Sequence, residues 1–472
     1  MLLQVLQCLQ GALKASTASH VLIAVIFLLG LVFAVVIQTE RISTTREELK
    51  HLRRLSLSSS NMADQFDPKF DAREGIATEP VRIQAIYIHP VKSCKPIEVD
   101  RAMLTKTGFM YDRCFAFATE ITTEIATANT DEGSKWRFIS QRTKPMMSQI
   151  ITELWLPENE ENLHNPLVQA GGCVVISFRD PDAPGWIRWL EGFYRAQNPT
   201  AAPQISFIAP LQPTVAQIDK LEITPKIFTI HDRDAKGLDM GGLPSVAAAL
   251  PKLKKFLGIP KDRGLTLLKC TPDTLTRTTK NLAPLDNIGS PAIHGYTDQQ
   301  PVNINSLSSI HAVSALLPPE NQPLNALRFR ANLWITGAPA YEEESWKRCR
   351  ILPKAISPRP RADVAPTLSV VCRTSRCTMP NVDPSKGIFT TNLPPPDKDK
   401  GKPQPSTTLK RCRTVENGNK MALGYIGMHC VPEDRSLKEA AEQKAGLYVE
   451  VGDEIEVLER GAHLYGSTGN DY

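Results

Sequence analysis

The sequence predicts a β-rich, mixed α+β fold preceded by an amino-terminal transmembrane helix. Short runs of branched and aromatic residues that end at turn residues recur along the chain, and each run is typical of a β-strand. Two segments with helical apolar spacing add an α component. One unbroken apolar run, from Val21 to Ile37, predicts the membrane helix.

Length and composition are those of a large globular protein. The 472 residues are 42% hydrophobic and 22% charged, which is enough to bury a core in two or three units. The 55 basic and 50 acidic residues are spread without a concentrated basic stripe, so no nucleic-acid partner is expected. The ten cysteines form neither a Cys-x-x-Cys set nor a disulfide framework, which favours a reducing compartment and gives a zinc site little support.

The apolar run is long enough to cross a bilayer once its flanks are included, and we expect a signal anchor over residues 17–38. A cleaved signal peptide and a buried helix are the alternatives, but the run is long for a signal peptide and no cleavage pattern follows it. Only Lys14 precedes the run, whereas five basic residues follow it closely: Arg41, Arg46, Lys50, Arg53 and Arg54. This bias predicts a single-pass membrane protein whose carboxyl-terminal domain is cytosolic.

Strand patterns dominate the first half of the chain that follows. The first, Val81 to His89, ends at Pro90 and leads into a loop that carries Lys92 and Ser93. The further strand patterns are Cys114 to Thr119, Arg137 to Ser140, Gln149 to Trp155, Cys173 to Phe178 and Lys226 to His231.

Helices and further strands are expected in the second half. Leu243 to Leu257 has helical spacing and stops at Gly258, and Ser308 to Leu317 is a second helix. Leu447 to Leu458 predicts two short strands around a Gly-Asp turn. Leu327 to Thr336 alternates as an amphipathic strand, with one face for packing and one for binding; the binding face carries Arg328, Arg330, Asn332 and Trp334.

Cys377 is the candidate catalytic residue and metal ligand. A thiolate is a soft ligand, and neighbouring Arg373 or Arg376 favours the deprotonated form. Turn residues that include Asn381 and Asp383 follow, so Cys377 is expected where a strand ends and a loop begins. The alternative is a buried structural cysteine, which is the commoner role for an unpaired cysteine.

Several cations and donors at the edges of predicted elements suit a phosphate, because arginine grips phosphate oxygens through a planar fork and lysine adds a point charge. These candidates are Lys92, Ser93, Arg113, Arg330 and Asn332. Simple solvation is the alternative for each of them taken singly. The absence from the sequence of a Gly-rich nucleotide loop, a Gly-x-Ser-x-Gly elbow and a His-Glu-x-x-His helix leaves kinase and hydrolase functions without support.

Six motifs occur in one order between Val81 and Leu458. They are IYIHPVKSC from Ile86, Tyr111-Asp112-Arg113, Ile139-Ser140-Gln141-Arg142, Arg328-Phe329-Arg330-Ala331-Asn332, Glu344-Ser345-Trp346, and SRCTMPNVDP from Ser375. With these motifs the chain resembles the MOSC-domain family, and most closely its mitochondrial amidoxime reducing component subgroup. The resemblance implies a MOSC N-terminal β-barrel domain packed on a MOSC β-barrel domain.

The resemblance and the composition together give the expected boundaries. They are an amino-terminal tail at 1–16, the anchor at 17–38, a charged and polar linker at 39–79, the MOSC N-terminal β-barrel domain at 80–232, a helical connector at 233–265, the MOSC domain at 266–462, and a tail at 463–472. A Pro- and Lys-rich segment at about 392–420 is expected to be a disordered insertion in the MOSC domain.

The resemblance also implies a molybdenum-molybdopterin cofactor between the two domains. Cys377 would ligate the molybdenum, flanked by Ser375 and Arg376. The pterin and its phosphate would be bound by Lys92, Ser93, Arg113, Arg330 and Asn332, together with Ser375 and Arg376 beside the metal.

The implied activity is the reduction of N-hydroxylated compounds of the amidoxime type by removal of oxygen. The subgroup receives electrons from cytochrome b5 and NADH-cytochrome b5 reductase, and its arrangement implies the mitochondrial outer membrane, with the endoplasmic reticulum as the alternative. One alternative function is a non-catalytic carrier of sulfur or molybdenum cofactor, because MOSC domains also occur attached to pyridoxal-phosphate-dependent sulfurases. A membrane scaffold that keeps the fold without chemistry is the other.

Overall fold

The structure is a computed structural model. It describes residues 20, 22, 25–26, 47–71, 80–121, 135–158, 164–183, 204–231, 233–278, 283–354, 362–417 and 419–463. The chain divides into two compact units. The smaller unit comprises residues 1–53 and 157–169, and the larger comprises residues 54–156 and 170–472.

Backbone hydrogen bonds join the two stretches of the smaller unit. The amide of Glu158 donates to the carbonyl of His51 at 3.0 Å. The side chain of Asn165 donates to the carbonyl of Lys50 at 2.9 Å and caps α2 (Pro166–Gln169) by accepting from the amide of Leu167 at 2.8 Å. The side chain of Asn165 thus caps the start of α2 and also links the two stretches of the smaller unit.

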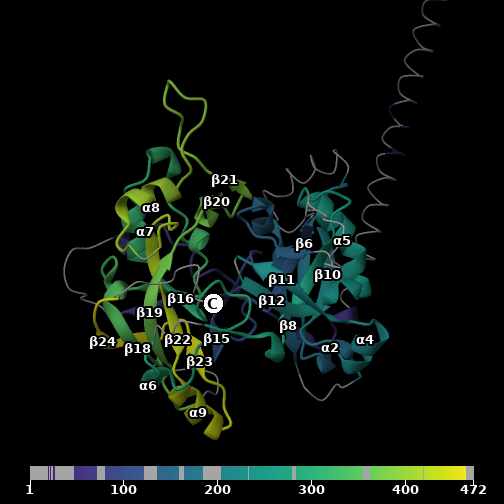
Figure 1. Ribbon diagram of the computed structural model, residues 1–472, viewed down its shortest axis with the longest axis horizontal. Coiled ribbons are helices and arrows are strands. Elements are labelled where there is room, and N and C mark those ends of the chain that lie inside the picture. The colour runs from purple at the N-terminus through teal and green to yellow at the C-terminus, as the bar shows by residue number, and fades with distance from the viewer. Residues whose placement is uncertain are drawn as a thin grey trace, which may run out of the picture. The chain divides into compact units, whose positions relative to one another are not determined.

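A closed barrel occupies one part of the larger unit (Figure 1). Its strands, in spatial order, are β11 (Pro225–Ile230), β12 (Arg233–Asp239), β13 (Leu265–Lys269), β6 (Phe115–Ile121) and β7 (Lys135–Phe138). A parallel pairing of β11 with β7 closes it. Strand β6 is buried on both faces: Ala116 and Ala118 belong to one apolar cluster, Phe115 and Phe117 to another, as the alternation of a strand requires.

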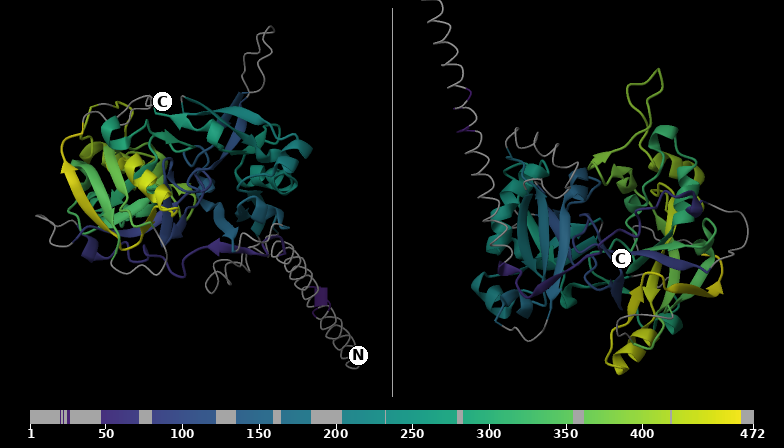
Figure 2. Two further views of the ribbon diagram at one scale, coloured as in Figure 1. Left: turned by 90° about the horizontal axis from the view of Figure 1, so that it is seen from below. Right: turned by 180° about the vertical axis from the view of Figure 1, so that it is seen from behind.

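An eight-stranded sheet forms the second large element of this unit. In spatial order its strands are β17 (Leu333–Thr336), β16 (Val302–Ser306), β22 (Tyr425–Pro432), β19 (Thr367–Ser375), β18 (Trp346–Leu352), β24 (Glu454–Arg460), β2 (Arg82–Ile88) and β3 (Ile97–Val99). Because β2 pairs with both β24 and β17, the strands from β17 to β2 form a closed ring of pairings. Figure 2 shows the yellow carboxyl-terminal strand beside green strands of this sheet in both views.

Smaller sheets complete the β structure. One has the order β1 (Leu52–Leu55), β8 (Ile151–Pro157), β9 (Cys173–Arg179) and β10 (Gln204–Pro210). Another has the order β23 (Tyr448–Glu450), β4 (Arg101–Thr105) and β5 (Gly108–Phe109). The remaining pairs are β14 (Thr276–Arg277) with β15 (Ile293–His294), and β20 (Val382–Asp383) with β21 (Ile388–Phe389).

Short helices connect these strands. The α-helices of the larger unit are α4 (Val215–Lys220), α5 (Pro244–Phe256), α6 (Leu285–Ile288), α7 (Leu307–Ser314), α8 (Ser406–Cys412) and α9 (Asp434–Glu442). The 3-10 helices are η1 (Pro68–Phe70), η2 (Pro145–Gln149), η3 (Met240–Gly242), η4 (Pro272–Thr274), η5 (Pro319–Asn321), η6 (Ala326–Phe329), η7 (Glu342–Ser345) and η8 (Met379–Asn381). The two helices predicted from apolar spacing correspond to α5 and α7.

The sheets do not follow the boundaries expected along the chain. Strand β2, from the segment expected to build the first domain, pairs with β17 and β24 of the second. Strand β12 lies inside 233–265, so the expected connector contributes a strand to the closed barrel as well as α5. Strand pairing depends on long-range partners, which the local pattern does not reveal.

The segment at about 392–420 also differs from the expected disordered insertion. Residues 393–400 are exposed, in keeping with their composition. Residues 404–413, however, are largely folded into the unit, because α8 buries Thr408 and Leu409, and the side chain of Gln404 accepts from the hydroxyl of Thr408 at 2.9 Å. Buried side chains and hydrogen bonds to distant residues, such as that from the amide of Ser406 to the side chain of Asn381 at 2.9 Å, thus order a stretch that composition alone classes as mobile.

The predicted transmembrane helix and single-pass membrane localisation are not supported by the structure. A spanning helix needs roughly 20 consecutive apolar residues. Among the residues that the structure describes, no helix has the length and apolar character needed to cross a membrane. Of residues 17–38 only His20, Leu22, Val25 and Ile26 are described, so the rest of the predicted anchor lies outside the described residues. We therefore no longer assign a membrane anchor, or a contact with a lipid bilayer, to this protein.

Gly427 offers a test of how β22 is held against β16. Its φ is +79°, and an added methyl group would clash with the side chain of Asn305 and lie 2.8 Å from the carbonyl of Ile304. Gly258 has a φ of +60° but no atom within 4 Å of such a methyl group. We expect Gly427→Ala to lower the free energy of unfolding by about 3 kcal/mol and Gly258→Ala by about 1 kcal/mol, because only the first adds a steric conflict to the backbone cost. Thermal unfolding checks this, and equal losses would contradict it.

Candidate functional site

A cavity of about 980 Å³ in the larger unit brings the predicted site residues together. All eight line it: Lys92, Ser93, Arg113, Arg330, Asn332, Ser375, Arg376 and Cys377. Its volume is at the upper end for a small-molecule site and leaves room for more than one ligand. The sequence motifs thus meet in one place, although they are spread over 285 positions between Lys92 and Cys377.

Cys377 lies directly after β19, at the strand end predicted for it. β19 ends at Ser375, and η8 begins two residues after Cys377. The amide of Met379 donates to the sulfur of Cys377 at 3.4 Å, which points the thiol back over the start of η8. Asp383 forms the following turn, as predicted, since its carboxylate accepts from the amide of Ser385 at 2.9 Å.

The two arginines expected to favour the thiolate have other partners. Arg373 forms ion pairs with Glu344 and Glu416. Arg376 donates to the carbonyl of Ile426 from Nε at 2.9 Å and from one terminal nitrogen at 2.7 Å, and to the carbonyl of Phe329 at 2.8 Å. Arg376 therefore anchors the Cys377 loop to β22 and η6, while its charge stays at the cavity wall.

The segment around Arg330 differs from the predicted amphipathic strand. Residues 326–329 form η6, capped by Asn325, and only residues 333–336 are strand. Arg330 between them has the left-handed conformation, with φ 54°. The prediction of a regular strand is therefore wrong, and Trp334, expected on the binding face, is fully buried. The other residues of that face, Arg328, Arg330 and Asn332, line the cavity. The turn instead directs Arg330 into the cavity, where one nitrogen donates to the carbonyl of Cys94 at 2.8 Å.

A second tight turn presents Ser93, which has a φ of 68°. The side-chain amide of Gln141 donates to the backbone carbonyl of Ser93 at 2.8 Å and holds the turn in place. Arg113 also has a positive φ, 49°. Non-glycine residues in this conformation are uncommon and cluster at functional sites, so three of the predicted site residues share this sign of strain.

Several buried donors on residues that line this cavity have no partner among the described residues. They include the hydroxyls of Ser93 and Thr297, one terminal nitrogen of Arg330 and Nε of Arg328. Buried polar atoms normally have a hydrogen-bond partner, and an unmatched one costs about 1–3 kcal/mol. These atoms therefore form a ready site for the oxygens of an anion.

Arg113 is held by a buried carboxylate. Asp112 pairs with the guanidinium of Arg113 and accepts from the amide of His89 at 2.7 Å. Arg113 also donates to the carbonyl of Arg330 at 3.1 Å. Burial, with Arg113 and Arg330 nearby, lowers the pKa of His89 to about 3, so this histidine is neutral. It supports the wall of the cavity and carries no charge of its own.

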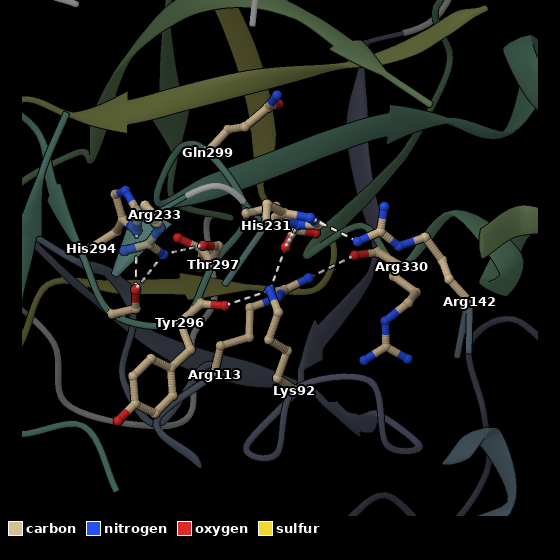
Figure 3. Close-up of polar contacts among 12 residues, drawn as sticks. Lys92, Arg113, Arg142, His231, Arg233, His294, Tyr296, Thr297, Gln299 and Arg330 are labelled. Atoms are coloured by element: carbon tan, nitrogen blue, oxygen red, sulfur yellow. Dashed lines mark hydrogen bonds and ion pairs between the residues drawn. The ribbon is translucent and has the colours of Figure 1, made fainter. Parts of the chain in front are cut away.

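The structure adds a polar chain that the sequence motifs did not identify (Figure 3). Arg142 lies 2.7 Å from Nδ1 of His231, and Nε2 of His231 lies 3.0 Å from Oδ1 of Asp298. Lys92 completes the chain by pairing with Asp298 and donating to the carbonyl of Tyr296 at 2.8 Å. Arg142 is the last residue of the motif that begins at Ile139. No local sequence signal marks His231 or Asp298, because each acquires its role only through partners that are distant in the chain.

The cavity is strongly cationic. Seven lysines and arginines are among the described residues that line it: Lys92, Arg113, Arg142, Arg328, Arg330, Arg376 and Lys420. Burial lowers the pKa of Arg376 to about 9 and, with Arg113 adding to the effect, that of Arg330 to about 10. Burial would raise the pKa of Asp298, but Lys92 and His231 hold it well below the usual range. At neutral pH the wall thus has several positive charges and one ionised carboxylate.

Cys377 supplies a single sulfur at this site. Within the described part of the chain, no three or more His, Cys, Asp or Glu side chains form a group that could hold a metal ion. Cys372 is fully buried, and His429 is neutral because burial lowers its pKa to about 3. The arrangement suits a large anionic ligand that brings most of its own chemistry.

Comparison with known protein families identifies two domains in the chain. Residues 80–171 match the MOSC N-terminal beta barrel domain, and residues 291–456 match the MOSC domain. No curated protein matches the chain. The chain therefore contains both domains, and each contributes part of the cavity wall: Lys92 and Arg113 lie in the first match, Arg330 and Cys377 in the second.

MOSC domains are associated with proteins that bind molybdenum cofactor, and the family is broadly linked to molybdenum-cofactor sulfurase and reductase activities. This agrees with the predicted domains and with a molybdenum cofactor as the class of ligand. The matches do not reach the level of the subgroup, so the similarity to amidoxime reducing components stays a prediction.

The pKa of Lys92 gives a pH test of anion binding. Burial lowers it to about 8, against the opposing effect of Asp298. The positive charge is therefore present below about pH 8 and is lost as the pH rises through that value. We expect the affinity of the cofactor-free chain for sulfate to fall about tenfold between pH 7 and pH 9, the loss of one charge-assisted hydrogen bond. Titration calorimetry measures this. Lys92→Met should bind sulfate weakly with no such step, and an unchanged step in that variant would assign it to another group.

Proposed function

We propose that this protein is a molybdenum-molybdopterin-dependent oxidoreductase that reduces N-hydroxylated compounds of the amidoxime type by removing oxygen. The observation that carries the proposal is the placement of a single thiol, Cys377, in a cavity whose unpartnered donors and cations match a phosphate-bearing ligand. The MOSC domains support a molybdenum cofactor as that ligand.

The residues present fit such a cofactor. Its phosphate would meet the unpartnered atoms of Ser93 and Arg330, with Lys92 and Arg113 adding charge. Cys377 would provide one sulfur to the metal, and a soft thiolate suits molybdenum that the pterin dithiolene already holds. Asn332 and Arg376 line the cavity, but the hydrogen bonds of their side chains within the protein make them supports of its wall.

When bound, the cofactor would supply the two-electron redox change that oxygen removal requires. The chain would do the rest by positioning. Buried Phe329 and the loop that carries Cys377 would exclude water from the part of the cavity beside the thiol, while the exposed side chains of Lys420 and Met421 would meet an incoming substrate first.

The electrons would come from cytochrome b5 and its NADH-dependent reductase. This part of the proposal rests on the subgroup resemblance.

A carrier of cofactor or sulfur is the alternative that an experiment must separate from the reductase. Both functions need Cys377 and the anion-binding residues. Only the reductase oxidises reduced cytochrome b5 when an N-hydroxylated substrate such as benzamidoxime is added. A chain that binds molybdopterin and shows no such turnover would favour the carrier.

Cys377→Ala tests the thiol directly. We expect the variant to remain folded, to lose at least about 100-fold in benzamidoxime reduction and to hold less molybdenum per chain, because the metal loses its protein ligand. Elemental analysis and turnover measure both. Cys412→Ala is the matched control, since Cys412 is a partly exposed cysteine on α8 that does not line the cavity. Unchanged turnover in Cys377→Ala would contradict the ligand assignment.

A further inference from the structure

Asp298 is the single carboxylate among the described residues that line the cavity, against seven lysines and arginines. It lies in the loop between β15 and β16, and its side chain is 47% exposed. Its two oxygens are used unequally by the protein.

Both described contacts of Asp298 are made by the same oxygen. Oδ1 pairs with the ammonium of Lys92 and lies 3.0 Å from Nε2 of His231. Oδ2 has no hydrogen-bond partner among the residues that the structure describes. An ionised carboxylate offers about four acceptor positions, so Oδ2 keeps its full capacity to accept from a ligand.

The hydrogen bonds of His231 fix the proton that supports this arrangement. A guanidinium can only donate, so Nδ1 of His231 accepts from Arg142 at 2.7 Å. Nε2 therefore carries the hydrogen and donates to Oδ1 of Asp298. The neutral imidazole turns Oδ1 toward His231 and Lys92, which leaves Oδ2 on the side away from these two donors.

The loop that carries Asp298 is held from both ends. Arg233 donates to the carbonyl of Thr297 at 3.1 Å and to the hydroxyl of Thr276 at 2.7 Å. On the other side, His429 and the side chain of Gln299 are 2.8 Å apart. The carboxylate is thus preorganised, and a ligand that binds Oδ2 need not order the loop first.

Two further acceptors on residues that line the cavity, Oδ1 of Asn303 and Oε1 of Gln300, are buried without a partner among the described residues. The side-chain nitrogen of Asn303 donates to the carbonyl of Met428 at 3.2 Å, which fixes the orientation of the amide because that carbonyl can only accept. Three acceptors, one of them charged, therefore belong to the lining of a cavity that is otherwise rich in donors.

We propose that Oδ2 of Asp298 binds an N–H donor of a ligand that contains an amidine-type group, in which an amino group is attached to a carbon doubly bonded to nitrogen. This inference rests on the proposed function, because two molecules expected at the site carry that group: the aminopyrimidine ring of the pterin and the amidoxime substrate. The charge of the carboxylate strengthens such a bond, and the surrounding cations exclude a ligand that brings a positive charge of its own. Neutral compounds with this amidine-type group are therefore the class that this wall recognises.

Titration calorimetry on the cofactor-free full chain tests the proposal with two neutral probes, pterin and benzamidoxime. Asp298→Asn keeps one oxygen as acceptor for Lys92 and His231 and replaces the other by an amide nitrogen, which donates. We expect about a tenfold loss of affinity for the recognised probe, as for one hydrogen bond to a charged group. Loss for pterin alone assigns Oδ2 to the cofactor, loss for benzamidoxime alone assigns it to the substrate, and loss for both assigns it to each in turn. No loss for either probe, or no binding of either to the wild-type chain, overturns the proposal.

Two controls keep the test decisive. Asp182→Asn makes the same substitution in an exposed ion pair with Lys255 outside the cavity lining, and it should bind both probes as the wild type does. If Asp298→Asn fails to fold, the wild-type chain still decides: acetophenone oxime, in which a methyl group replaces the amino group of benzamidoxime, should bind about tenfold more weakly, as expected for the same lost hydrogen bond, and equal binding overturns the proposal. A wild-type chain that never contains molybdenum contradicts the proposed function and leaves both binding tests intact.

Discussion

The buried amide of Asn332 is the contact on which the cavity depends. Its backbone amide donates to the carbonyl of Asn303 at 2.9 Å, and its carbonyl accepts from the amide of Tyr87 at 2.8 Å. Its side chain donates to the carbonyl of Tyr87 at 3.1 Å and accepts from the amide of Asn303 at 3.2 Å. One residue thus joins β2, from the first domain, to β16 and β17 of the second. A buried amide with both ends satisfied specifies one register, because any shift would leave its polar atoms without partners.

The cationic side chains of the site divide into those that build it and those that face a ligand. Arg376 donates to the carbonyls of Phe329 and Ile426, and Arg328 donates to the carbonyl of Pro380. These bonds tie η6, η8 and β22 together, although Nε of Arg328 is left without a partner among the described residues. Ser93 and Arg330 keep unpartnered donors, and Lys92 has a lowered pKa. Charge alone therefore does not identify the ligand-binding residues. Buried donors without a partner in the protein identify the ligand-binding residues better than charge does. Such a donor costs free energy until a ligand accepts its hydrogen bond.

Positive φ angles at Ser93, Arg113 and Arg330 are part of the same construction. Each lies at the turn where a strand or short helix ends, and each turn places a polar side chain toward the cavity. Such conformations cost free energy and persist where surrounding hydrogen bonds determine them, as the bond from Gln141 to Ser93 does. The two domains therefore hold three turns with a positive φ and one thiol in the lining of the same cavity.

The sequence alone determined the β-rich class, the positions of α5 and α7, the strand end at Cys377 and eight of the residues that line the cavity, because periodicity, turn residues and ordered motifs are local signals. It misjudged Leu327 to Thr336, where a capping asparagine and a left-handed arginine replace a regular strand. It also placed a membrane helix that the described residues do not support. Only the tertiary structure decided that β2 pairs with β17, that Asn332 serves the fold, and that Asp298 meets Lys92 and His231. Those outcomes depend on atoms brought together from distant parts of the chain, where no local pattern carries the information.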